Sequence, residues 1–213
     1  MVKFHKIMKP LILLIPGTQA KEHRLLHGFV KAFCHYFGVD LSGDHILTDL
    51  KTYLQQNTSF EVLVFPWSQG ISDIFSIKSD AQALAHIIKE NKSRPEIVLF
   101  GKSLGGRVAE LAAKYADYQA NISKLLYVAT PHSTKHGDFP KTIKRVNIYS
   151  SADNYVRFTN IVLYFNFTKT DLNGAQNIVI PNVRHSMFNK NIHVTWQNRK
   201  VVLFEVYKKI ILK

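Results

Sequence analysis

Short, unbroken apolar segments alternate along this chain with longer segments whose apolar residues recur at helical spacing. The apolar segments are rich in Leu, Ile and Val, and strands that are apolar throughout are typical of a parallel sheet covered on both faces. They predict strands at Leu11–Pro16, Glu61–Trp67, Glu96–Phe100, Lys124–Thr130, Arg145–Ser151 and Asn177–Val183. This alternation constrains the chain to the α/β class.

The segments between these strands predict helices. They lie at Lys21–Phe37, from near Asp44 onward, at Ala81–Glu90, at Leu104–Tyr115 and at Arg199–Leu212. We therefore expect an open, mostly parallel sheet of about six strands with helices on both faces. The 213 residues contain no internal repeat or linker, so residues 1–213 are expected to form one domain.

Composition excludes several other classes. A hydrophobic content of 46% and a charged content of 20% are typical of a globular protein. One cysteine, Cys34, leaves no internal disulfide and no cysteine-based zinc site. The longest apolar run, Leu11–Ile15, is too short to span a membrane, so we expect a cytoplasmic protein.

The chain is strongly basic, with a formal net charge of +13. Its lysines and arginines are scattered rather than interleaved with aromatics, so no nucleic-acid partner is expected. Peripheral contact with an anionic membrane surface is one alternative, and the basic segment 198–213 could lie on such a surface with its apolar stripe inward. The simpler role of that segment is to cover one face of the sheet.

The segment Gly101-Lys102-Ser103-Leu104-Gly105 has the pattern G-x-S-x-G between a predicted strand and a predicted helix. In that context the glycines allow a tight turn that exposes the serine hydroxyl at the helix N-terminus. The P-loop spacing is absent, because no glycine lies five residues before Gly101. We therefore predict Ser103 as a nucleophile.

A serine nucleophile needs a base and a group that orients the base. Catalytic groups of open parallel sheets follow the carboxyl ends of strands. Asp153 and His185 both come directly after predicted strands, and the order Ser103, Asp153, His185 suits a hydrolase triad. Asp171 is the alternative acid.

The segment Leu11–Ala20 can be interpreted as a secretory signal or as a buried strand with a glycine turn. Its apolar run is shorter than a typical signal core, and the second interpretation provides a donor for an oxyanion hole. We predict that the backbone N–H groups of Thr18 and Leu104 form this hole, with Gln19 as the alternative to Thr18.

Together, "LILLIPGT", "FGKSLGGRVA", "VATPHS", "YSSADNYV" and "VRHSMF" resemble the α/β-hydrolase superfamily on its lipase and esterase side. The resemblance covers nearly the whole chain. It differs from many members at Pro16 and Lys102, where those members carry histidine. Only a short loop, Pro131–Lys144, stands where large members insert a cap, which implies a small cap or none.

The resemblance implies a serine hydrolase that cleaves carboxylic esters through an acyl-enzyme, acting on a small-molecule or lipid acyl ester. It also implies that no metal or organic cofactor is required. Gln19, Trp67, Phe75 and His132 are the candidate substrate-binding residues, although His132 could equally be structural and the apolar residues could pack beneath a helix. An acyltransferase or thioesterase with the same triad, and a non-catalytic binding module with a basic surface, are the alternative functions.

Overall fold

The sheet predicted from the apolar segments is the centre of the structure. A computed structural model describes residues 8–17, 47–66, 77–118, 120–132, 139–164 and 171–213. Six strands form one sheet in the order β2-β1-β3-β4-β5-β6, and each neighbouring pair is parallel. The strands are β1 (Leu11–Ile15), β2 (Glu61–Val64), β3 (Ile97–Lys102), β4 (Ile122–Val128), β5 (Lys144–Tyr149) and β6 (Gln176–Val179).

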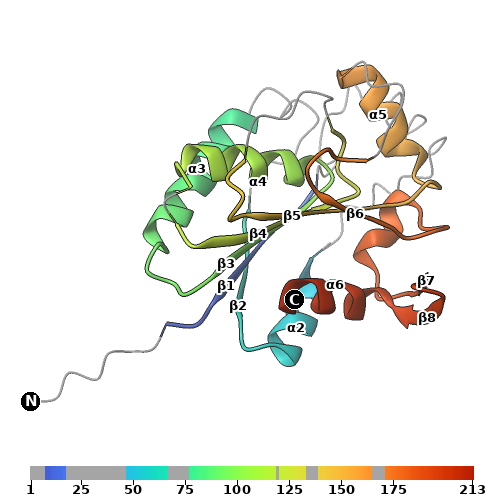
Figure 1. The fold of residues 1–213 in the computed structure, drawn as a ribbon, viewed down its shortest axis with the longest axis horizontal. Helices are drawn as coiled ribbons and strands as arrows, with labels where there is room; N and C mark the ends of the chain where they lie inside the picture. Colours follow the sequence, from blue (N-terminus) through green and yellow to red (C-terminus); the bar gives the residue numbers. More distant parts are fainter. Residues whose placement is uncertain (1–7, 18–46, 67–76, 119, 133–138, 165–170) are drawn as a thin grey trace, which may run out of the picture.

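Helices cover both faces of this sheet (Figure 1). On one face lie α3 and α4, and on the other lie α2 and α6, while α5 follows the end of β5. Their bounds are α2 (Thr48–Asn57), α3 (Ile77–Glu90), α4 (Leu104–Tyr115), α5 (Asn154–Tyr164) and α6 (Leu203–Leu212). The predicted open α/β fold is therefore confirmed, whereas the predicted helix Lys21–Phe37 lies outside the described residues.

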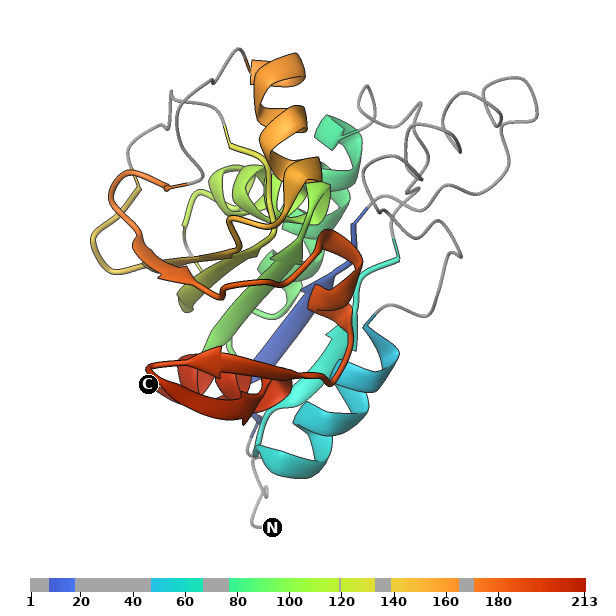
Figure 2. The same ribbon diagram turned by 90° about the vertical axis from the view of Figure 1, so that its right-hand side faces the viewer.

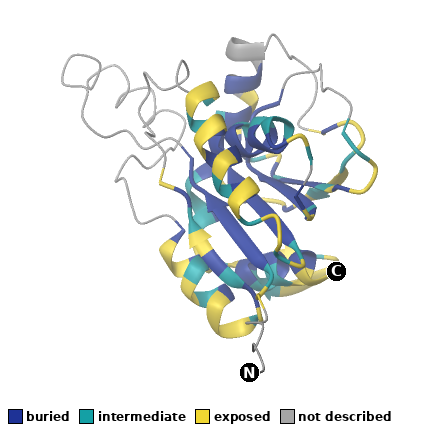
Figure 3. Ribbon diagram, turned by 90° about the vertical axis from the view of Figure 1, so that its left-hand side faces the viewer, coloured by how far each residue is buried: buried dark blue, intermediate teal, exposed yellow. Residues whose placement is uncertain are grey.

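β1 shows how continuous apolar strands produce two cores. Its five residues are all buried, and successive side chains of a strand point to opposite faces. Ile12 and Leu14 belong to the core under α2 and α6, whereas Leu11, Leu13 and Ile15 belong to the core under α3 and α4. Figure 3 shows the same arrangement as buried strands between helices whose outer faces are exposed.

The C-terminal region differs from the prediction of one helix over Arg199–Leu212. A hairpin of β7 (His193–Trp196) and β8 (Arg199–Val202) comes first, and only Leu203–Leu212 is helical. The hairpin turns at Gln197 and Asn198, which both have positive φ. The apolar residues at helical spacing are Leu203, Val206, Tyr207, Ile210 and Ile211, which all lie in α6, so the periodicity does not support a helix that begins before Leu203.

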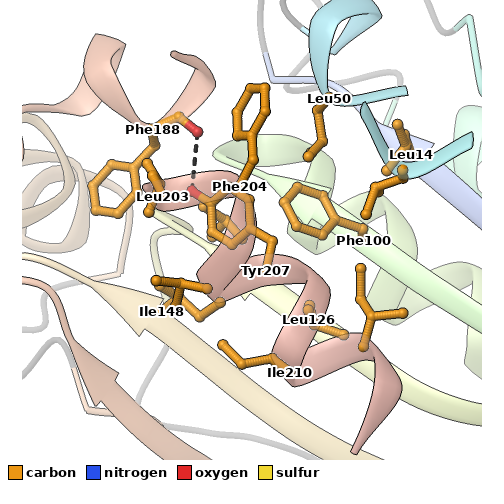
Figure 4. Packing of buried hydrophobic residues seen from close by; sticks show 14 of the residues in the cluster. Leu14, Leu50, Phe100, Leu126, Ile148, Phe188, Leu203, Phe204, Tyr207 and Ile210 are labelled. Carbon is orange, nitrogen blue, oxygen red and sulfur yellow. Dashed lines mark hydrogen bonds between the residues drawn. The ribbon is translucent and has the colours of Figure 1, made fainter. Parts of the chain in front are cut away.

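α6 covers the sheet through its apolar side chains. Phe204, Tyr207 and Ile210 are buried in one core with Phe100 of β3 and Ile148 of β5 (Figure 4). The apolar stripe of this segment therefore packs against the sheet, as in the simpler of the two predicted roles. A contact between the basic surface of the protein and an anionic membrane stays a prediction. No helix in the described ranges is long and apolar enough to cross a membrane.

Two further elements lie at the end of the sheet where the strands finish. α5 begins directly after Asp153, and a short 3₁₀ helix, η2 (His185–Asn189), begins at His185. Neither had been predicted from the sequence. Figure 2 shows the parallel strands leading toward this end of the molecule.

Candidate active site

Ser103 lies in a strained turn between β3 and α4, the elbow, residues 101–105. Its φ is 51° and its ψ is −132°, a conformation that side-chain-bearing residues rarely adopt. Strain of this kind amounts to about 1–3 kcal/mol and persists where the surrounding structure enforces it. The elbow therefore presents the serine at the first turn of α4.

The glycines around Ser103 make this turn sterically feasible. A Cβ atom at Gly101 would lie 2.4 Å from the Cα atom of Gly106. A Cβ atom at Gly105 would lie 2.3 Å from the carbonyl oxygens of Ile15, the last residue of β1, and of Pro16. Both distances are far below a van der Waals contact, so strand, turn and helix approach as closely as they do because these residues lack side chains.

The structure brings the three predicted catalytic residues together from distant parts of the chain. His185 Nε2 lies 3.1 Å from the Oγ atom of Ser103, and His185 Nδ1 lies 2.9 Å from Oδ2 of Asp153. The three residues follow the carboxyl ends of β3, β5 and β6. Each is less than a tenth exposed. Nucleophile, base and orienting acid thus have the spacing that acyl transfer needs.

Asp153 is held in place by backbone contacts as well as by His185. Its Oδ1 atom accepts a hydrogen bond from the N–H of Val156 at 3.1 Å, and its own N–H donates to the carbonyl of Ser150 at 3.1 Å. The alternative acid, Asp171, is exposed and accepts a hydrogen bond from the hydroxyl of Tyr149. Asp153 is therefore the acid that contacts the histidine.

Burial lowers the pKa of His185 below its usual value of 6.5, although the carboxylate of Asp153 opposes this effect. The positive charge of Lys102 lowers the pKa further. A neutral imidazole that donates from Nδ1 to Asp153 leaves Nε2 free to accept the Ser103 proton. The ring of Tyr155, on α5, packs against His185 with 4.5 Å between ring centroids.

One serine joins the two turns that carry the acid and the histidine. The Oγ atom of Ser150 accepts hydrogen bonds from the N–H of Ala152 at 3.1 Å and from the N–H of Val183 at 3.2 Å. Ser150 is fully buried. Neither Ser150 nor Tyr155 could be predicted from the sequence, because no sequence pattern tells which side chains near strand ends will contact neighbouring turns.

The predicted oxyanion hole is only partly within the described residues. Leu104 is the first residue of α4 and is buried beside Ser103, whereas Thr18 and Gln19 lie outside the described part. Gly17, which precedes Thr18, comes close to the nucleophile, because a Cβ atom there would lie 2.8 Å from the Cβ atom of Ser103. The loop after β1 therefore starts beside the serine.

Of the four candidate substrate-binding residues, only His132 is described; Gln19, Trp67 and Phe75 are not. His132 is 1% exposed, and its Nε2 atom lies 3.1 Å from Oδ1 of Asn147. This position fits the structural alternative better than contact with substrate. No group of three or more His, Cys, Asp or Glu side chains within the described ranges has a metal-binding arrangement.

Comparison with known proteins gives one family match and one match to a curated protein. The model of the family described as "PGAP1-like alpha/beta domain" matches residues 13–203. A GPI inositol-deacylase of Candida albicans is 38% identical over 93 residues, which cover 40% of this chain and 23% of that protein. The chain thus spans less than a quarter of this relative's length.

Solved structures of hydrolases share the fold. Est1E of Butyrivibrio proteoclasticus with bound ferulic acid is 14% identical and has a TM-score of 0.53, with 100% of this chain and 92% of that chain covered. Esterase 2 of Thermogutta terrifontis, phosphorylated by paraoxon, is 14% identical with a TM-score of 0.51, and the match covers 96% and 82% of the two chains. These matches show the α/β-hydrolase fold.

Proposed function

Since this chain belongs to the family of PGAP1-like alpha/beta domains, we propose that it is a serine hydrolase that cleaves carboxylic esters. The observation that carries the proposal is the hydrogen-bonded chain from Ser103 through His185 to Asp153 on a strained elbow. A buried serine, histidine and aspartate in this order of contacts have no evident structural role together, whereas each has a role in acyl transfer.

The reaction proceeds in two halves. Ser103 Oγ attacks the acyl carbonyl carbon while its proton passes to Nε2 of His185, and the carbonyl oxygen becomes an oxyanion held by the N–H groups of Leu104 and Thr18. The C–O bond to the alcohol then breaks, and the alcohol leaves with the proton from His185. Water attacks the acyl-enzyme in the same way, which releases the carboxylic acid and restores Ser103.

The environment of His185 supports this role. Burial holds its pKa below 6.5, so the imidazole is neutral and able to accept a proton at neutral pH. Asp153 fixes the tautomer that leaves Nε2 facing the serine, and it stabilises the imidazolium that forms during each half-reaction.

The substrate class that we propose is an acyl ester of an alcohol. The name of the Candida albicans relative states that it removes an acyl group from the inositol of GPI, and an ester of a hydroxyl is the chemistry that the two would share. Because the match covers 23% of that relative, we do not extend the proposal to its particular substrate. Acyl transfer or thioester hydrolysis would use the same three residues.

Labelling with a fluorophosphonate probe tests the proposal. We expect the purified protein to be labelled and Ser103→Ala and His185→Ala to remain unlabelled, because the first lacks the nucleophile and the second lacks its base. Ser93→Ala, which changes an exposed serine before β3, is the control and should be labelled like the wild type. Absence of labelling in a folded wild-type protein would contradict the proposal and favour a binding module.

If the protein is labelled, a second experiment compares its turnover rates on an oxygen ester and on a thioester with the same acyl chain. Faster turnover of the oxygen esters supports ester hydrolysis, whereas faster turnover of the thioesters favours a thioesterase. Transfer of the acyl group to an added alcohol in preference to water favours an acyltransferase.

A further inference from the structure

Lys102 is a buried lysine whose ammonium group has no partner of opposite charge among the described residues. It is the last residue of β3, directly before Ser103, and only 5% of it is exposed. Within the part of the chain that the structure describes, its ammonium group makes no hydrogen bond and no ion pair. A buried charge without a partner is strongly unfavourable, so such a residue calls for a physical explanation.

Lys124 is a second buried lysine, and its contacts indicate a structural role. It is 8% exposed, and its Nζ atom donates to the carbonyl of Ile211 at 2.5 Å and lies 3.4 Å from Oε1 of Glu96. These contacts join β4 to the end of α6. Lys102 is buried to a similar degree but has no such contacts, so its charge is available for a group that is not part of the described fold.

The positive charge of Lys102 interacts with two of the proposed catalytic residues, Asp153 and His185. Burial lowers the pKa of Lys102 from 10.5 to about 8, and the charge of Asp153 acts in the opposite direction. The positive charge of Lys102 in turn lowers the pKa of His185. The contacts that the Asp153 carboxylate makes within the described residues are with His185 and the N–H of Val156, so it acts on Lys102 through its charge and not through a hydrogen bond.

We propose that Lys102 pairs with a negatively charged group of the substrate, so that this site selects acyl esters that carry a phosphate or carboxylate near the ester bond. The inference rests on the proposed function and adds the substrate's charge to it. An ammonium group suits such an anion as a point charge on a flexible stem. Because Lys102 directly precedes Ser103 in the chain, such a pair would hold the anionic group near the reacting carbonyl.

The charge of the whole chain agrees with an anionic substrate. With 28 Lys and Arg residues against 15 Asp and Glu residues, the protein attracts anions at long range. Long-range attraction alone does not select among anions, because it acts on all of them. Lys102 would add the short-range contact that places the charge relative to the nucleophile.

A matched pair of substrates tests this inference. We compare kcat/KM for 1-acylglycerol 3-phosphate and for the 1-acylglycerol with the same short acyl chain, using wild-type protein, Lys102→Met and Lys102→Arg. We expect the wild type to prefer the phosphate-bearing ester and Lys102→Met to lose that preference by roughly ten- to a hundredfold, as expected for a lost contact to a charged group. Lys102→Arg keeps the charge and should retain most of the preference.

An unchanged ratio of the two kcat/KM values in Lys102→Met would overturn the inference. This includes the case in which both values fall equally, because Lys102 would then act on the triad and not on the substrate's charge. Circular dichroism and thermal unfolding establish that each variant is folded, and Lys102→Gln replaces Lys102→Met if the latter is not.

A binding measurement separates this inference from the proposed function. Inorganic phosphate is titrated by calorimetry into Ser103→Ala and into Ser103→Ala with Lys102→Met. Weaker phosphate binding in the double variant supports the anion contact even if the wild type is not labelled by fluorophosphonate, in which case only the hydrolase proposal fails. If the wild type is labelled but the two variants bind phosphate equally, the hydrolase proposal stands and the role of Lys102 is overturned.

Discussion

The charge of Lys102 is unfavourable in the folded chain, because burial lowers its pKa from 10.5 to about 8. A shift of that size corresponds to roughly 3 kcal/mol between the charged and neutral forms. The wild type bears this penalty in full below pH 8, and the penalty disappears as pH rises through 10.5, where the lysine of the unfolded chain is also neutral.

Lys102→Met should therefore raise the free energy of unfolding by up to roughly 3 kcal/mol near neutral pH, with a smaller gain at higher pH. Denaturant unfolding at several pH values measures the effect. Lys92→Met, at an exposed lysine, is the matched control and should change little. A destabilised Lys102→Met would mean that the lysine stem contributes more by packing than its charge takes away.

The protonation of His185 should set the acidic side of the pH profile of ester hydrolysis. Its pKa is below 6.5, chiefly because it is buried, and only the neutral imidazole can accept the Ser103 proton. The decline of kcat/KM on the acidic side should therefore have its midpoint below pH 6.5. A profile whose midpoint lies above 6.5 would show that the base is less buried in solution than in this structure.

Some residues of the candidate site could be predicted from the sequence, and others could not. Ser103 could be predicted because its glycine pattern fell on a strand–helix junction, and Asp153 and His185 because they follow strands of the same sheet. The burial of Lys102 could not be read from the sequence, since it depends on what packs around the end of β3. The contact of Ser150 with two turns depends on tertiary structure in the same way.

At the scale of elements, the turn after β5 and the turn after β6 are tied together by Ser150. Ser150→Ala would leave the N–H groups of half-buried Ala152 and buried Val183 without this acceptor. The loss amounts to about 1–3 kcal/mol for the buried Val183 group and less for that of Ala152. The turns carry Asp153 and His185, so their relative position should loosen.

We expect Ser150→Ala to lower kcat for ester hydrolysis more than it changes KM, because the triad and not the binding site is displaced. Steady-state kinetics on a folded variant measures both parameters, and Ser151→Ala, at the exposed neighbouring serine, serves as the control. A change confined to KM would indicate that Ser150 shapes the substrate site instead.

The elements themselves were predictable where periodicity was unambiguous. Leu104–Tyr115 has the bounds that the sequence predicted, because its apolar positions recur regularly after a glycine turn. The hairpin of β7 and β8 was not predicted, although Gln197-Asn198 between two short segments with β-branched residues is a usable turn signal. α5 was missed because Asp153 was considered only as a catalytic residue, although its side chain also accepts from the first turn of that helix.

At the scale of the whole molecule, the net charge of +13 predicts how hydrolysis depends on salt. Attraction between the protein and an anionic ester is screened as ionic strength rises, whereas a neutral ester is not affected in this way. We therefore expect kcat/KM for the phosphate-bearing ester to fall between about 20 and 300 mM salt, over which the Debye length shortens from roughly 20 to 6 Å.

The neutral ester with the same acyl chain is the control in that experiment. Its kcat/KM should change little over the same range. Parallel decreases for both esters would point to an effect of salt on the protein and not on the encounter with substrate.

The position of α6 has a consequence for how this protein is made. α6 follows every strand of the sheet in the chain, yet Tyr207 packs against Phe100 of β3 and donates to the carbonyl of Phe188 near His185 (Figure 4). While the chain is still being translated, the sheet can form with α3 and α4 on one side, but its other side is incompletely covered until residues 203–212 have left the ribosome. During synthesis, that half-covered sheet is where chaperones or other nascent chains would attach.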